Sequence, residues 1–88
     1  MVIRRTERFN NELKAVFDFI AKDSKNRAIE FIKKMLDNVE LLEANPLMGR
    51  TITQNKRELI FRGYIIPYMI DDEVIYLLGV YKANEWKS

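Results

Sequence analysis

The groups in this chain that are able to do chemistry are cations, carboxylates and tyrosines, because the sequence contains no histidine and no cysteine. Histidine is the usual general base and metal ligand near neutral pH, so an acid–base step would depend on lysine, arginine, tyrosine or a carboxylate. From Thr51 onward, apart from one acidic turn, five cations stand against the carboxylates of Glu58 and Glu85. The cations are Lys56, Arg57, Arg62, Lys82 and Lys87. If the fold brings them together, we expect a modest basic rim beside a predicted sheet.

Two other groups of residues invite a functional interpretation. Asp71, Asp72 and Glu73 are adjacent carboxylates in a predicted turn, where such side chains are mostly solvated. We therefore expect neither a metal nor a cofactor. Tyr64 and Tyr68 share one face of a predicted strand, because successive side chains point to opposite faces. We predict that both tyrosines pack in the core or at its rim and do not act in catalysis.

Length and composition predict a single folded domain, residues 1–88. The chain is 48% hydrophobic and 32% charged, which is typical of a folded, soluble protein. It has no apolar run near the ~20 residues of a membrane-spanning helix, and its first residues lack the apolar run of a signal peptide. With the absence of cysteine, these features favour a cytoplasmic protein. The net charge of +2 permits an acidic partner without indicating one.

The first half of the chain predicts a short strand and then a helical hairpin. The strand covers Val2 to Arg5. Thr6 is a suitable N-cap for a first helix that ends near Asp23, and Ser24 is a suitable N-cap for a second helix from Lys25 to Ala44. The apolar residues on one face of the first helix are Phe9, Leu13, Val16, Phe17 and Ile20. Those of the second helix are Ile29, Ile32, Leu36, Val39 and Leu42.

The second half predicts an antiparallel meander of three strands. Asn45-Pro46 ends the second helix, because the residue before proline is disfavoured in the α region. Strand-forming residues dominate positions 57–81, which Gly63 and the acidic turn divide into three. Pro67 has no amide to donate to a ladder, so we expect it at a sheet edge or a bulge. The last strand, Val74 to Tyr81, is apolar on both faces and is expected to be central.

Helices that precede a run of strands favour a two-layer α+β fold. We therefore predict a short N-terminal strand, a helical hairpin and a three-stranded antiparallel meander, with the helices packed on one face of the sheet. Composition and periodicity alone indicate no particular function.

Five segments follow one another with the spacing of a known family. They are Phe17–Asp23, Asn45–Arg50 with its Pro-x-x-Gly-Arg pattern, Arg57–Leu59, Gly63–Tyr68 and Val74–Tyr81. Over nearly the whole chain they resemble the RelE/ParE superfamily of toxins from type II toxin–antitoxin modules. The resemblance implies this α+β fold and a ParD/RelB-like antitoxin whose C-terminal segment folds on the toxin. It leaves open a homodimer or a hetero-oligomer with the antitoxin.

Two activities occur in the superfamily. RelE-like members cut messenger RNA on the ribosome with basic and tyrosine side chains, which stabilise the phosphate in the transition state. In this chain the resemblance would give that role to Lys56, Arg57, Arg62 and Tyr64. ParE-like members share the fold but inhibit DNA gyrase.

Departures from the RelE-like pattern favour the ParE-like interpretation. Glu58 stands where a second lysine is expected, Ile65 stands where an arginine follows the family's tyrosine, and positions 82–84 contain no arginine. Each missing cation would remove stabilisation from a phosphate site. We therefore predict a toxin that binds a protein target such as gyrase and is not an enzyme. The alternatives are a ribosome-dependent mRNA interferase, or a diverged relative that only binds antitoxin.

The predicted target-binding surface consists of cations and one tryptophan. The candidates are Arg50, Arg57, Arg62, Lys82, Trp86 and Lys87. Structural roles are the alternative for three of them. Arg50 would bond carbonyls at a helix end, and Arg57 would form a surface ion pair with Glu58. Trp86 would cover the helices or, as an exposed residue, anchor a partner.

Overall fold

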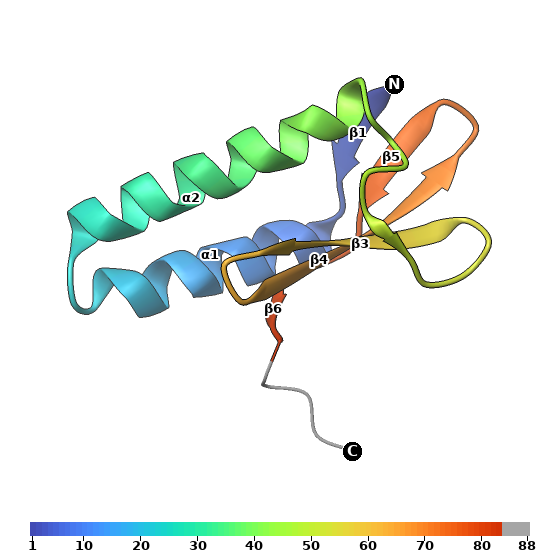
Figure 1. Ribbon diagram of the computed structural model, residues 1–88. Coiled ribbons are helices and arrows are strands. Elements are labelled where there is room, and N and C mark those ends of the chain that lie inside the picture. The colour runs from blue at the N-terminus through green and yellow to red at the C-terminus, as the bar shows by residue number, and fades with distance from the viewer. Residues whose placement is uncertain (84–88) are drawn as a thin grey trace, which may run out of the picture.

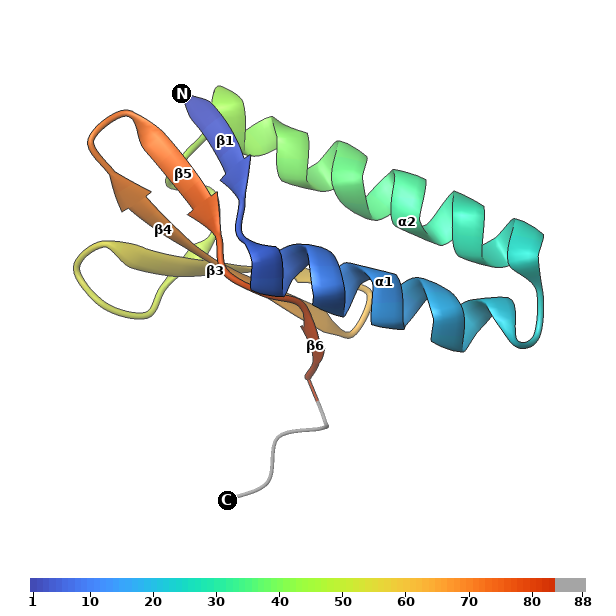
Figure 2. The ribbon, with the colours of Figure 1, turned by 180° about the vertical axis from the view of Figure 1, so that it is seen from behind.

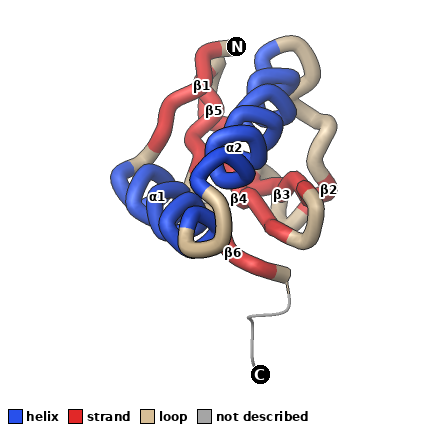
Figure 3. The backbone as a smooth tube through the Cα atoms, turned by 90° about the vertical axis from the view of Figure 1, so that its left-hand side faces the viewer, coloured by secondary structure: helices blue, strands red, loops and turns tan. Residues whose placement is uncertain are grey.

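The computed structural model describes residues 1–83, which form a helical hairpin packed against a six-stranded mixed sheet (Figure 1). The elements in chain order are β1 (Val2–Arg5), α1 (Glu7–Ala21), α2 (Lys25–Glu40), the 3-10 helix η1 (Leu41–Glu43), β2 (Arg50–Thr51), β3 (Lys56–Phe61), β4 (Tyr64–Asp71), β5 (Val74–Leu77) and β6 (Tyr81–Lys82). The strand order is β1-β5-β4-β3-β2, and β6 also pairs with β4. Both helices lie on the same side of the strands (Figure 3). The predicted α+β class is confirmed.

Hydroxyl side chains cap both helices, as the sequence predicts. Thr6 Oγ1 accepts a hydrogen bond from the Phe9 amide at 3.1 Å, and Ser24 Oγ accepts one from the Arg27 amide at 3.2 Å. Each bond satisfies an amide that has no partner within the helix. The second helix was predicted to continue further, but α2 ends at Glu40 and the tighter turn of η1 follows.

The core lies between the hairpin and the sheet face that it covers. One face of each helix meets every second residue of β3, β4 and β5. The largest fully buried side chains are Phe9, Met35, Leu42, Ile66, Tyr68, Ile75 and Leu77. Tyr64 belongs to the same cluster, so the predicted packing of both tyrosines in the core is confirmed. Burial of each large apolar side chain contributes roughly 1.5–3 kcal/mol, so the hairpin and the sheet depend on each other.

The sheet is larger than the predicted meander. Strands β3, β4 and β5 form that meander with antiparallel pairing. β1 pairs with β5 in parallel, with Ile3 opposite Ile75. As predicted, β5 is therefore an interior strand with a neighbour on each side. The periodicity of a strand reports which side chains share a face, not which strand lies beside it, so it did not indicate the parallel pair.

The strand predicted from Val74 to Tyr81 is interrupted after β5. Residues 78–80 lie opposite only two residues of β4, Ile66 and Pro67, before pairing resumes in β6. One extra residue on one strand is a β-bulge, which bends that strand. The expectation of an edge or a bulge for Pro67 is confirmed by the bulge: β4 is an interior strand, and the proline lies opposite the bulged residues. The Pro67 carbonyl accepts a hydrogen bond from the Leu78 amide at 2.9 Å. In an antiparallel pair the carbonyl and the nitrogen of one residue point to the same neighbouring strand. The hydrogen bond that proline is unable to donate would therefore have pointed towards the bulge.

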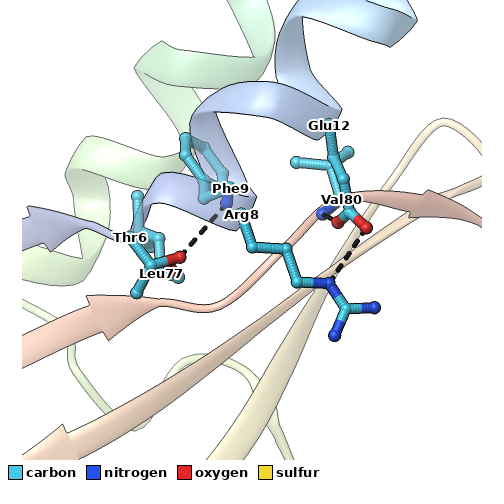
Figure 4. A network of polar contacts seen from close by, with 6 residues as sticks. All are labelled: Thr6, Arg8, Phe9, Glu12, Leu77 and Val80. Atoms are coloured by element: carbon cyan, nitrogen blue, oxygen red, sulfur yellow. Dashed lines mark hydrogen bonds and ion pairs between the residues drawn. The ribbon is translucent and has the colours of Figure 1, made fainter.

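A carboxylate holds the bulge against α1 (Figure 4). Glu12 Oε1 accepts from the Val80 amide at 2.7 Å, and Glu12 Oε2 accepts from Arg8 Nε at 3.0 Å. The carboxylate supplies this amide with the partner that a regular ladder would have given it. Gly79 makes the approach possible, because a Cβ atom at this position would lie 2.5 Å from Glu12 Oε1.

The start of α1 lies beside the end of β5 (Figure 2), and Thr6 joins the two (Figure 4). Its hydroxyl donates to the Leu77 carbonyl at 2.7 Å while it accepts from the Phe9 amide. The Thr6 amide donates to the same carbonyl at 3.2 Å. One side chain therefore caps the helix and fixes it against the sheet.

We expect Thr6→Ala to lower the free energy of unfolding by about 2 kcal/mol, because it removes a helix cap worth ~1 kcal/mol and a bond to the sheet of similar size. Ser24→Ala is the matched control; it removes the exposed cap of α2 and should cost about 1 kcal/mol. Urea unfolding measures both values. Equal losses for the two variants would contradict the joining role of Thr6.

Candidate functional site

The described cations do not form a single rim. Lys56 begins β3 and Arg62 follows its end, so the two are separated by roughly 20 Å at ~3.3 Å of rise per residue. Lys82 lies in β6, near the Arg62 end, where the Ala83 amide donates to the Gly63 carbonyl at 2.8 Å. The structure therefore brings Lys82 towards Arg62 and leaves Lys56 at the other end of the strand.

Lys82 borders a hollow between α1 and β6. The hollow measures about 380 Å³ and is lined by Glu12, Ala15, Val16, Phe19, Tyr64, Val80, Tyr81 and Lys82. Lys82 Nζ lies 5.0 Å from the centre of the Phe19 ring, within the range of a cation–π attraction. The other two candidates from the end of the chain, Trp86 and Lys87, lie outside the described residues.

The residues of the alternative nuclease set do not converge on one point. Tyr64 is buried and packs edge-on against Phe31 of α2, with 5.5 Å between the ring centres. Arg62, with a φ of 48°, forms the turn between β3 and β4 with Gly63, and its guanidinium lies 5.1 Å from the centre of the Phe61 ring. The lysine that begins β3 lies at the opposite end of that strand. No phosphate could contact all of these side chains at once.

The loop of residues 45–50, between η1 and β2, is fixed from beneath by Tyr68. The Tyr68 hydroxyl donates to the Pro46 carbonyl at 2.8 Å and accepts from the Gly49 amide at 2.9 Å. Tyr68 is fully buried in β4, and this burial raises its pKa above the ordinary 10.0, although the Gly49 amide and the charge of Arg57 act to lower it. A core side chain thus determines the shape of a surface loop.

Arg57 fixes the same loop from its side. Its Nη1 donates to the Gly49 carbonyl at 2.8 Å and to the Leu47 carbonyl at 3.2 Å. Arg50 was expected to bond backbone carbonyls at a helix end, but it bonds the Glu58 carboxylate instead, and Arg57 bonds the carbonyls of this loop. Bonds from a charged donor are stronger than those between neutral groups. Because Tyr68 and Arg57 together hold the backbone of residues 45–50, we call this segment the clamped loop.

The Glu58 carboxylate, which was expected to pair with Arg57, pairs with Arg50 instead. Arg50 Nε and Glu58 Oε1 are 2.7 Å apart across the β2–β3 pair, where the two residues are directly opposite. The expected Arg57–Glu58 pair is wrong because neighbours in a strand point to opposite faces. The Glu58 side chain is only 13% exposed and that of Arg50 is 65% exposed. Glu58 thus holds an arginine that faces solvent.

The clamped loop presents apolar side chains to solvent. Leu47 is 64% exposed and Met48 is 42% exposed. Gly49 permits the tight packing beneath them, because a Cβ atom there would lie 2.7 Å from the Glu58 carbonyl and from the Tyr68 hydroxyl. Sequence reasoning identified the Pro-x-x-Gly-Arg pattern but not these two residues, because an exposed leucine has no signature in the sequence.

The sheet face opposite the helices carries apolar and charged side chains together. Alternation along β3, β4 and β5 places on it residues that include Ile60, Ile65, Met69 and Tyr76. Ile60 is 52% exposed, whereas Ile65 is buried but does not belong to the core cluster. We call this surface the open sheet face. By the same register Arg4, Arg50, Lys56 and Glu58 also lie on this face, and a surface that mixes apolar and charged residues in this way is typical of many protein-binding sites.

Two negative findings concern residues 1–83 alone. No group of three or more potential ligand side chains is placed to hold a metal ion. No helix is both long and apolar enough to span a membrane.

A helical hairpin on one face of a mixed sheet is the α+β fold that the resemblance to the RelE/ParE superfamily implied. A sequence model of the ParE toxin of the type II toxin–antitoxin system parDE matches residues 3–85. The chain therefore belongs to the ParE toxin family, as the resemblance implied.

Among solved structures, a chain of the chromosomal ParDE toxin–antitoxin system from P. aeruginosa has the same fold. The TM-score is 0.82 over 96% of this chain and 97% of that chain, at 19% sequence identity. At this identity the likeness establishes the fold alone. Comparison with curated proteins gave no match.

Tyr68→Phe should lower the free energy of unfolding by about 2 kcal/mol, because it leaves the buried Gly49 amide without its acceptor. Tyr76→Phe is the matched control on the open sheet face and should change stability by less than ~0.5 kcal/mol. Urea unfolding of both variants measures the difference. A Tyr68→Phe variant as stable as the wild type would contradict the clamp.

The raised pKa of Tyr68 also predicts a loss of stability in alkali. The folded chain holds the phenol proton more tightly than the unfolded chain, whose tyrosine titrates near 10.0. The contribution is complete below pH 10 and falls as the pH rises through the folded-state pKa. As the pH rises above 10, the wild type should therefore lose more stability than Tyr68→Phe. Parallel pH profiles for the two proteins would contradict this prediction.

Proposed function

We propose that this ParE-family toxin acts by binding a protein target, with DNA gyrase as the first candidate, and that a ParD/RelB-like antitoxin neutralises it in the cytoplasm. The observation that carries the proposal is the combination of exposed apolar surface with cations that do not converge. Protein recognition depends on buried apolar anchors, whereas phosphate chemistry depends on several charges at one point.

Binding is favoured over cleavage because two of the candidate cations, Arg50 and Arg57, already form bonds within the chain. The guanidinium of Arg57 bonds the carbonyls of the clamped loop, and that of Arg50 bonds Glu58. Ile65, where a nuclease would need an arginine, lies on the open sheet face and is buried there. An mRNA interferase would have to cleave without free guanidinium groups from Arg50 and Arg57 and without an arginine at position 65. This activity is the alternative that the experiment below must exclude.

The open sheet face is the surface that we assign to the antitoxin. It lies opposite the helical hairpin and combines apolar residues of three strands with charged ones, so an extended or helical segment could lie across several strands at once. A segment that is disordered alone loses conformational entropy on binding and needs a large apolar area to offset that loss. The open sheet face supports this assignment because its apolar residues come from three adjacent strands.

Induction of the chain alone in a bacterial host tests the proposed function. We expect growth arrest with a DNA-damage response and intact transcripts, and rescue by the antitoxin when both are expressed. Purified toxin should inhibit supercoiling by gyrase. Codon-phased cleavage of translated messages would replace this proposal with the interferase, and normal growth would indicate a relative that only binds antitoxin.

A further inference from the structure

The clamped loop is held far more firmly than a plain surface turn requires. Four bonds from Tyr68 and Arg57 fix its backbone. Within the loop the Met48 amide donates to the Asn45 carbonyl at 3.0 Å, and Asn45 Nδ2 donates to the Leu41 carbonyl at 3.2 Å. These bonds order a segment whose largest apolar side chains, Leu47 and Met48, are exposed to solvent.

A small hollow with a cation at its side adjoins the loop. It measures about 310 Å³, and its apolar wall includes Met48, Leu59 and Ile60. Asn38, Gly49, Arg50 and Glu58 complete the lining. In the part of the chain that the structure describes, Arg50 bonds through Nε alone, so its two terminal nitrogens are available to a further acceptor. The hollow therefore suits an apolar side chain with a carboxylate next to it.

We propose that Leu47, Met48 and Arg50 are the surface by which this toxin docks on its protein target. The complementary site on the target is an apolar patch flanked by a carboxylate, which would reach the terminal nitrogens of Arg50. This inference rests on the proposed function, because it assigns the surface that the proposed binding uses. A nucleic acid does not fit, because two of the three side chains are apolar and one arginine alone would neutralise a single phosphate.

The target is favoured over the antitoxin as the occupant for a physical reason. A toxin acts when it is free of its antitoxin, so its target-binding surface must keep its shape without a partner. The clamped loop meets this requirement, since the bonds that shape it come from its own chain. A surface that is ordered before binding loses little entropy on association, so a few anchor residues can provide most of the affinity.

The test is the double variant Leu47→Ser with Met48→Ser, induced alone and compared with the wild type. Both side chains are exposed, so the fold should be retained, and thermal unfolding followed by circular dichroism verifies this. We expect survival to rise at least tenfold, because the apolar anchors are lost while the clamp remains. Ile29→Ser is the matched control, since it removes an exposed apolar residue of α2 that is remote from the loop, and it should stay fully toxic.

A second variant separates the charge from the apolar anchors. Arg50→Gln should weaken toxicity less than the double variant does, and Arg50→Lys should restore part of the loss because it keeps the charge without the guanidinium fork. Both variants keep Leu47 and Met48 in place. Loss of toxicity in all Arg50 variants together with a lower melting temperature would assign Arg50 a structural role and overturn its part in docking.

The outcomes distinguish this inference from the proposed function. A wild-type chain that does not arrest growth would overturn both. A toxic wild type with an equally toxic double variant would overturn the docking surface and leave the proposed function standing. A double variant that stays toxic but escapes rescue by the antitoxin would assign the clamped loop to the antitoxin, which also overturns the inference.

Discussion

The hydroxyl of Tyr68 is the polar group on which much of this structure depends. It lies in β4, the central strand of the sheet, and its ring fills the core beneath the helices while its hydroxyl bonds the backbone of the clamped loop on both sides. A buried hydroxyl must be hydrogen-bonded, since an unsatisfied one costs about 1–3 kcal/mol. The core and the loop therefore impose their geometry on each other, and neither is free to relax alone.

The β-bulge after β5 shows a second constraint of the same kind. Pro67 removes one donor from the ladder, and the extra residue on the opposite strand removes the need for it. The amide of Val80 that the bulge displaces is bonded by Glu12 of α1, and Gly79 leaves room for that carboxylate. Residues distant in the sequence thus compensate for a single break in the sheet. The hollow beside β6 lies at this break.

The helices and the order of the elements could be predicted from the sequence because both follow from local chemistry. Thr6 and Ser24 are cap residues and the apolar stripes have helical spacing, although α2 ends at Glu40, before the predicted stop at Pro46. The pairing of β1 with β5 could not be predicted in this way, since alternation says nothing about a distant neighbour. The same limit explains why Arg50 and Arg57 exchanged their expected tasks. Their distances from Glu58 and from the loop carbonyls are set by strand pairing and not by spacing along the chain.

The order of synthesis adds a consequence of the clamp. Residues 45–50 leave the ribosome before Arg57, and well before Tyr68, so the groups that shape the loop are the last of the set to be made. Until β4 pairs with β3, the loop lacks both of its holding side chains. A growing or truncated chain that ends before β4 therefore exposes the same leucine and methionine without their fixed arrangement. The surface is assembled only in a chain that has completed its central strand, and an unfinished toxin does not carry it.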